Sequence, residues 1–376
     1  MIYLLTNRAV EPDGHGAERI VNDGKEAARP VFRLATVELH ASDPKKDEVE
    51  LVPDQFVEQY DRVQPDDPPE KHAGSKRMFL DLYQRMRDEP SKKKGDVLFF
   101  IHGFQYTLED SLQHLRKLHD LYVKPADSPV SHLVYFSWPS RGRITGYRDD
   151  RRDAIESGKL LGRVFRKARQ FLVEFFASLP DPRDAFCGHR IHLAAHSMGN
   201  MVLYWMTHEL NTYPDPPFSL FGEMLLLNAD CDWDAFNPAV PLHRLPEYGD
   251  RIHIYNHQGD DALWLSQNTK NWVKRLGRQG PADLNLLPSR TLVVDCSGLK
   301  KGTAKDPRKD SFAPVAGRVS LGTETPSKET LMDHWGYLYR PEVMEDIRAT
   351  LRGEGSAAIA GRTATSNPRL FKLKDA

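Results

Sequence analysis

Cysteine is scarce in this chain of 376 residues, which contains only Cys187, Cys231 and Cys296. Their number is odd and they lie far apart, so a disulfide framework is excluded as the basis of the fold. A large chain with so few thiols is typical of a reducing compartment. We therefore expect a cytoplasmic protein.

Long apolar runs are also lacking, since no stretch approaches the roughly 20 residues needed to span a bilayer. Residues 1–5 are apolar, but no basic leader precedes them and the chain turns polar directly afterwards, so no secretory signal is expected. The formal net charge of -1 provides no overall basic field to attract nucleic acid or anionic lipid. We expect a small-molecule partner, no nucleic acid and no membrane span; the sequence does not indicate the oligomeric state.

Strand patterns alternate with helical patterns from about residue 96 to residue 351. The six clearest strands cover 97–101, 133–136, 191–195, 224–227, 252–255 and 291–294. They lack strict alternation of apolar and polar residues, which is typical of parallel strands buried on both faces. Apolar residues recurring every three or four positions from Leu161 to Phe176 predict a long helix packed on the sheet. The predicted fold class is α/β, a doubly wound, mostly parallel sheet flanked by helices.

No shift in composition divides this pattern, so we predict a single domain over residues 1–352. Residues 1–5 and 32–39 favour antiparallel edge strands. Loop insertions are expected near 40–75 and 299–329, where polar, Gly and Pro residues follow no period. The same character over 353–376 predicts a flexible C-terminal tail.

The strand 191–195 runs directly into His196-Ser197-Met198-Gly199, a pattern typical of a nucleophile elbow. In that turn the serine adopts a strained backbone conformation, and the residues two positions before and after it must be small. Ala195 and Gly199 meet this need, although the usual pattern has glycine at both positions. Ser197 is therefore the candidate nucleophile.

A serine hydroxyl becomes nucleophilic when a histidine takes its proton and a carboxylate holds that histidine. In doubly wound hydrolases the acid and then the histidine follow the serine, on loops after later strands. Asp260, after the strand 252–255, is the candidate acid, and Asp261 is the close alternative. His334, between the last strand and a helix beginning near Pro341, is the candidate base.

Asp230 and Asp232 follow an earlier strand and are the fallback acids. The run 230–234 resembles a calcium loop, but it lacks the glycine at the sixth position and the glutamate at the twelfth. We therefore expect no metal site. His102 and His196 lie close to the site in sequence and are expected to orient the turn and the loop after the first core strand.

Acyl transfer also needs N–H donors for the oxyanion of the tetrahedral intermediate. The backbone N–H of Met198, directly after the serine, is the first candidate. The second should come from the loop after strand 97–101, where Gly103 lets the backbone approach a substrate. Phe104 is the candidate there, with Gln105 next. This chemistry needs no cofactor.

These motifs together resemble the α/β-hydrolase superfamily, and within it a bacterial branch catalogued as a domain of unknown function. The motifs are Phe100-Ile101-His102-Gly103-Phe104, Ser137-Trp138-Pro139-Ser140 with the following Tyr147, Ala195-His196-Ser197-Met198-Gly199, Asp260-Asp261 and Asp333-His334, with Thr6-Asn7-Arg8 near the start. The resemblance implies a serine hydrolase and leaves the substrate open. In this setting Trp138 and Gln105 are expected in the substrate pocket, and the alternative for Trp138 is a core residue that closes a turn.

The first hypothesis for function is therefore hydrolysis of a carboxylic ester or thioester through an acyl-serine intermediate on a Ser-His-Asp triad. A lipase or acyltransferase could use the same triad. A third hypothesis is a catalytically idle hydrolase scaffold that acts as a binding module, because a fold does not fix a function.

Overall fold

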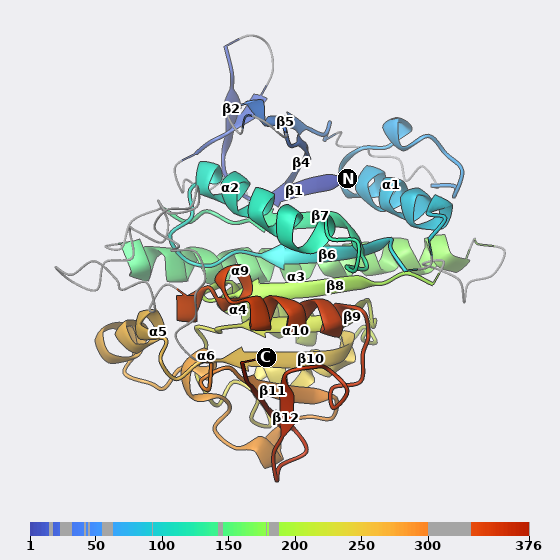
Figure 1. The fold of residues 1–376 in the computed structure, drawn as a ribbon. Helices are drawn as coiled ribbons and strands as arrows, with labels where there is room; N and C mark the ends of the chain where they lie inside the picture. The colour runs from blue at the N-terminus through green and yellow to red at the C-terminus, as the bar shows by residue number, and fades with distance from the viewer. Residues whose placement is uncertain are drawn as a thin grey trace.

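The computed structural model describes residues 1–14, 18–22, 32–40, 43, 46–54, 63–91, 93–141, 146–177, 179, 188–299 and 332–375. Within these residues the chain forms an 11-stranded sheet, ordered β12-β13-β11-β10-β9-β8-β6-β7-β1-β4-β5, and a separate hairpin of β2 and β3 (Figure 1). The strands of the sheet are β1 (Ile2–Thr6), β4 (Arg33–Glu38), β5 (Glu48–Leu51), β6 (Asp96–Ile101), β7 (Val130–Ser137), β8 (Ile191–His196), β9 (Phe221–Leu227), β10 (Gly249–Asn256), β11 (Thr291–Asp295), β12 (Arg362–Ala364) and β13 (Leu370–Leu373). The hairpin strands are β2 (Val10–Pro12) and β3 (Glu18–Ile20).

The six predicted core strands are confirmed as β6 to β11, and every ladder between them is parallel. The predicted antiparallel strands near the start are β1 and β4, which pair with each other, but β1 also forms a parallel ladder with β7 and lies inside the sheet. The fold class, a mostly parallel α/β sheet, is as predicted. Because the core strands run parallel, the loops at their carboxyl ends meet at one edge of the sheet, where a site can form.

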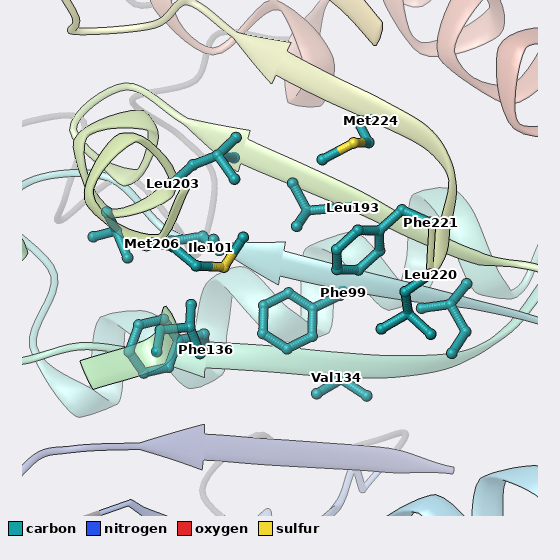
Figure 2. Close-up of a cluster of buried hydrophobic side chains, with 14 of the residues drawn as sticks. Phe99, Ile101, Val134, Phe136, Leu193, Leu203, Met206, Leu220, Phe221 and Met224 are labelled. Atoms are coloured by element: carbon teal, nitrogen blue, oxygen red, sulfur yellow. The ribbon is translucent and has the colours of Figure 1, made fainter. Parts of the chain in front are cut away.

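Helices cover both faces of the sheet. They are α1 (Gly74–Asp88), α2 (Leu108–Leu118), α3 (Tyr147–Ala177), α4 (Gly199–Asn211), α5 (Asp261–Leu265), α6 (Leu276–Gln279), α9 (Gly336–Tyr339) and α10 (Pro341–Leu351). One apolar core joins the sheet to α1, α3 and α4, and a second joins the opposite face to α2, α9 and α10. Figure 2 shows part of the first core, where Phe99, Leu193 and Met206 belong to one buried cluster. The helix predicted from Leu161 to Phe176 lies within α3.

The prediction of a flexible tail over 353–376 is wrong for most of that segment. β13 pairs in parallel with β11, and β12 pairs with β13 in an antiparallel ladder. Ile359, Phe371 and Leu373 are buried, so the segment is ordered by backbone pairing and by three apolar side chains. Local composition does not reveal this pairing, because its partner strand lies about 80 residues earlier in the chain.

The two predicted insertions have different outcomes. The region near 40–75 contains the edge strand β5, which pairs with β4, so part of it belongs to the sheet. The expected insertion at 299–329 lies outside the described residues except for Leu299, which is buried.

In the described part of the chain, Cys231 and Cys296 are buried free thiols, and Cys187 lies outside it. No helix among these residues is both long and apolar enough to cross a membrane.

Candidate active site

Ser197 lies in the turn between β8 and α4, in the left-handed backbone region with a φ of 51°. The turn is fixed from both sides, because the Ser197 N–H donates to Leu227 O at 3.0 Å and Ser197 O accepts from the Asp230 N–H at 3.0 Å. Space is tight around it: a Cβ added to Gly199 would lie 2.5 Å from His102 O. This is the geometry that the elbow pattern predicts, and it explains why position 199 needs glycine.

A non-glycine residue in the left-handed region is strained, so the stability of Ser197 variants can report this strain. We expect Ser197→Gly to be about 0.5–1 kcal/mol more stable than Ser197→Ala, because the relief of strain exceeds glycine's greater loss of backbone entropy. The comparison of two inactive variants separates backbone strain from chemistry. Urea unfolding of both measures it. An alanine variant at least as stable as the glycine variant would contradict the prediction.

The Asp260 carboxylate binds His334 and also begins α5. Its Oδ2 accepts a hydrogen bond from His334 Nδ1 at 2.8 Å, and its Oδ1 accepts one from the Leu263 N–H at 2.9 Å. One carboxylate therefore holds a histidine and caps a helix through different oxygens. Since Nδ1 carries the proton in this bond, His334 Nε2 is left as a proton acceptor.

Burial by itself would raise the pKa of the Asp260 carboxyl, which is fully buried. The charge of His334 and its hydrogen bond, with further bonds from Leu263 and Asn228, outweigh this and lower the pKa below its usual value. Asp260 is therefore an anion at neutral pH. That charge is suited to stabilising a protonated His334.

Asn228 is a residue of the site that sequence reasoning missed. It follows β9 with a φ of 44°, and its Nδ2 donates to Asp260 Oδ2 at 2.8 Å and to Asp333 O at 3.0 Å. It thus joins the acid to the backbone beside His334. The signal that the sequence offers for it is a polar residue directly after the apolar run 224–227.

His196 and His102 hold backbone segments of the site. His196 Nε2 donates to His334 O at 3.0 Å. His102 Nδ1 donates to Gly103 O at 2.7 Å, and its Nε2 accepts from the Trp138 N–H at 3.1 Å. These contacts agree with the orienting roles expected for both histidines.

The buried histidines predict how stability depends on pH. Burial, the main cause, lowers the pKa of His102, His114 and His196 well below the ordinary value of about 6.5. The folded protein keeps them neutral while the unfolded chain protonates them, so stability falls as the pH drops below about 6.5. Each group contributes up to about 1.4 kcal/mol per pH unit, so the free energy of unfolding should fall by about 4 kcal/mol from pH 6 to pH 5. Urea titrations at pH 7, 6 and 5 measure this; an unchanged free energy would contradict it.

The loop after β6 carries the second expected oxyanion donor. The Gln105 N–H donates to Ser140 Oγ at 2.8 Å and is therefore already used, which favours the Phe104 N–H. Within the described part of the chain, the N–H groups of Phe104 and Met198 donate to no other residue. A Cβ added to Gly103 would lie 3.1 Å from Ser197 Cβ, so this loop approaches the serine closely.

Ser197 and His334 line one pocket with about 640 Å³ of empty space, including its open mouth. Gln105 lines the same pocket, and its contact with a substrate stays a prediction. The pocket has an apolar wall of Phe104, Ala262, Leu263, Leu265 and Trp335, and a polar part made of His196, Tyr147, Asp230, Ser266 and Lys270.

The expectation that Trp138 belongs to the substrate pocket is wrong. Its side chain is fully buried, donates from Nε1 to His102 O at 2.8 Å, and stacks on the His102 ring at 5.1 Å. It does not line the pocket. The alternative, a core tryptophan that closes the turn after a buried strand, describes its position.

Of the candidate acids, Asp260 is the one bonded to His334. Asp261 lies in the first turn of α5. Asp230 and Asp232 both form ion pairs with the buried Arg275 instead. Among the described residues, no group of three or more His, Cys, Asp and Glu side chains is arranged to hold a metal ion.

A parallel sheet with this elbow, and with a histidine–carboxylate pair beyond later strands, defines an α/β-hydrolase scaffold. The chain belongs to the family described as alpha/beta hydrolase of unknown function (DUF900), whose model matches residues 81–311, more than half of the chain. The matched region includes Ser197 and Asp260, whereas His334 lies beyond it. No curated protein and no solved structure gives a significant match.

Proposed function

We propose that the protein is a serine hydrolase that cleaves a carboxylic ester or thioester through an acyl-serine intermediate. The observation that carries this proposal is the 2.8 Å bond from His334 to the buried Asp260, with Ser197 in its strained turn lining the same pocket. An anionic acid, an oriented histidine and a serine are the three parts that this chemistry needs.

In the proposed reaction, His334 Nε2 takes the Ser197 hydroxyl proton while Oγ attacks the carbonyl carbon. The N–H groups of Met198 and Phe104 donate to the resulting oxyanion. His334 then gives its proton to the departing alcohol or thiol, and the acyl group remains on Oγ. Water, deprotonated by His334, attacks the acyl-serine, and the acid is released as Ser197 recovers its proton.

Labelling with a fluorophosphonate probe, followed by peptide mapping, tests the proposal. We expect the wild type to carry one phosphonyl group on Ser197, and His334→Ala to lose the label because the serine is no longer activated. Ser289→Ala, at an exposed serine before β11, is the matched control and should label like the wild type. A folded wild type that stays unlabelled, or a label on another serine, would overturn the proposal.

A further inference from the structure

Large apolar side chains are exposed in one short part of the chain, α5 and the turn after it. Trp264 is 46% exposed, Trp272 80% and Val273 38%. The other large apolar residues that the described chain exposes are Met1, Val173 and Leu286. Two exposed tryptophans eight positions apart are unusual for a soluble surface, since indole rings are normally buried or held at interfaces.

The same segment forms a wall of the Ser197 pocket. Ala262, Leu263 and Leu265 of α5 line the pocket, and so do Ser266 and Lys270 of η7 (Ser266–Asn271). Trp264, Trp272 and Val273 are exposed instead, and we call these three residues the tryptophan face. In Figure 1, α5 projects outward from the edge of the sheet to which β10 points. A ligand held on the tryptophan face would therefore lie beside the pocket wall.

The backbone at Trp272 gives a second, independent observation. Trp272 ends η7 in the left-handed region with a φ of 57°, and its N–H donates to Gln267 O at 2.8 Å. A bulky residue is strained in this conformation. Since most of its side chain is in solvent, packing within the chain does not offset the strain, and strain of this kind is characteristic of functional segments.

The charges beside the tryptophan face indicate what it contacts. Lys270 and Lys274 are exposed on either side of Trp272 and Val273, and Lys270 also lines the pocket. Next to this segment the buried Arg275 pairs with both Asp230 and Asp232, and Lys274 Nζ lies 4.2 Å from the centre of the Trp233 ring. With a net charge of -1, the chain has no overall basic field. The attraction of an anionic partner therefore comes locally from Lys270 and Lys274. Tryptophan with flanking lysine is the composition that binds the boundary between water and anionic lipid.

The geometry points to residues 261–274 as a surface that docks on an anionic lipid–water interface. The tryptophan face enters the headgroup region, and Lys270 and Lys274 contact lipid phosphates. This inference rests on the proposed function and names its substrate class, which is esters with an apolar acyl chain. The ester would pass from the lipid interface into the pocket along α5. The apolar wall of Leu263, Leu265 and Phe104 suits such a chain.

Sedimentation of the full chain with phosphatidylcholine vesicles, with and without phosphatidylglycerol, tests the docking. We expect wild type to bind the anionic vesicles, and Trp264→Ala/Trp272→Ala to reduce the partition coefficient by about tenfold or more. Lys270→Gln/Lys274→Gln should remove the preference for anionic vesicles. Val273→Ala should weaken binding, whereas Val173→Ala, which alters a similarly exposed valine on α3, is the matched control and should not.

Circular dichroism shows that each variant is folded, and fluorophosphonate labelling of the tryptophan and valine variants, which change no residue of the pocket lining, shows that their site works. Vesicle binding without labelling in the wild type would support the docking surface and reject the proposed hydrolase activity, so the two failures are distinguishable. Wild type that binds neither vesicle, or tryptophan variants that bind as well as wild type, would overturn the inference. So would self-association that the tryptophan variants abolish in place of vesicle binding, because the face would then be a dimer interface.

Discussion

Ser197→Ala is expected to lower kcat for hydrolysis of a p-nitrophenyl ester by about 10⁴–10⁶-fold. The variant removes the only atom that forms the covalent bond to the acyl group, while the oxyanion donors and the pocket remain. The residual rate then comes from water attacking a bound and polarised ester. The variant keeps the groups that bind the substrate and loses the group that reacts with it. The loss should therefore appear in kcat rather than in KM.

The measurement needs ester turnover normalised to protein that is folded by circular dichroism. Ser289→Ala serves again as the control, since its side chain lies on the surface away from the pocket. If Ser197→Ala kept a tenth or more of the wild-type rate, hydrolysis would not pass through this serine.

Asp260→Asn should lower kcat by about 10³–10⁴-fold. The carboxylate accepts hydrogen bonds from His334 and Asn228 on one oxygen and from the Leu263 N–H on the other. An amide has a single oxygen, so one of these two sides must face an NH₂ group and lose its bonds. In either orientation the negative charge that stabilises a protonated His334 is gone.

Asp261→Asn is the matched control for this variant, because it makes the same change one residue along the same helix turn. We expect it to keep kcat within a few-fold of wild type. Rates measured across pH 6–9 with both variants test the assignment. Equal losses in the two variants, or a larger loss for Asp261→Asn, would show that Asp260 is not the acid.

The sequence predicted the parts of this site that depend on chain order. Ser197 and Asp260 follow the strands β8 and β10, and His334 precedes the helix α9. Parallel strands bring their carboxyl ends together whatever the loops contain. Local signals predicted where Ser197 and Asp260 lie along the chain, and the joint action of the three residues as a triad stays a prediction. Contacts made across the sheet were different, since Asn228 joins Asp260 and Asp333 through an amide whose partners the sequence does not indicate.

Trp138 and the C-terminal segment 353–376 also depend on contacts that the local sequence does not reveal. The Trp138 indole could close a turn or line a pocket, and only its bond to His102 decides between them. β13 is only four residues long, and its order comes from pairing with β11, a distant strand. The exposure of a side chain is equally hard to predict. Trp264 lies between two leucines and Trp272 is followed by Val273, and nothing in the local sequence indicates that both indole rings face solvent.

The order of strands in the sheet has a consequence for dissecting the protein. The segment that matches the family, residues 81–311, contains β6 to β11 but none of the strands that flank them. Expressed alone, it would leave β7 without β1 and β11 without β13, two bare edges with unpaired N–H and C=O groups. Such edges recruit other strands, so this fragment should aggregate. The segment that the family model matches is therefore shorter than the shortest fragment expected to be soluble. A fragment made for expression should also include the strands that pair with β7 and β11.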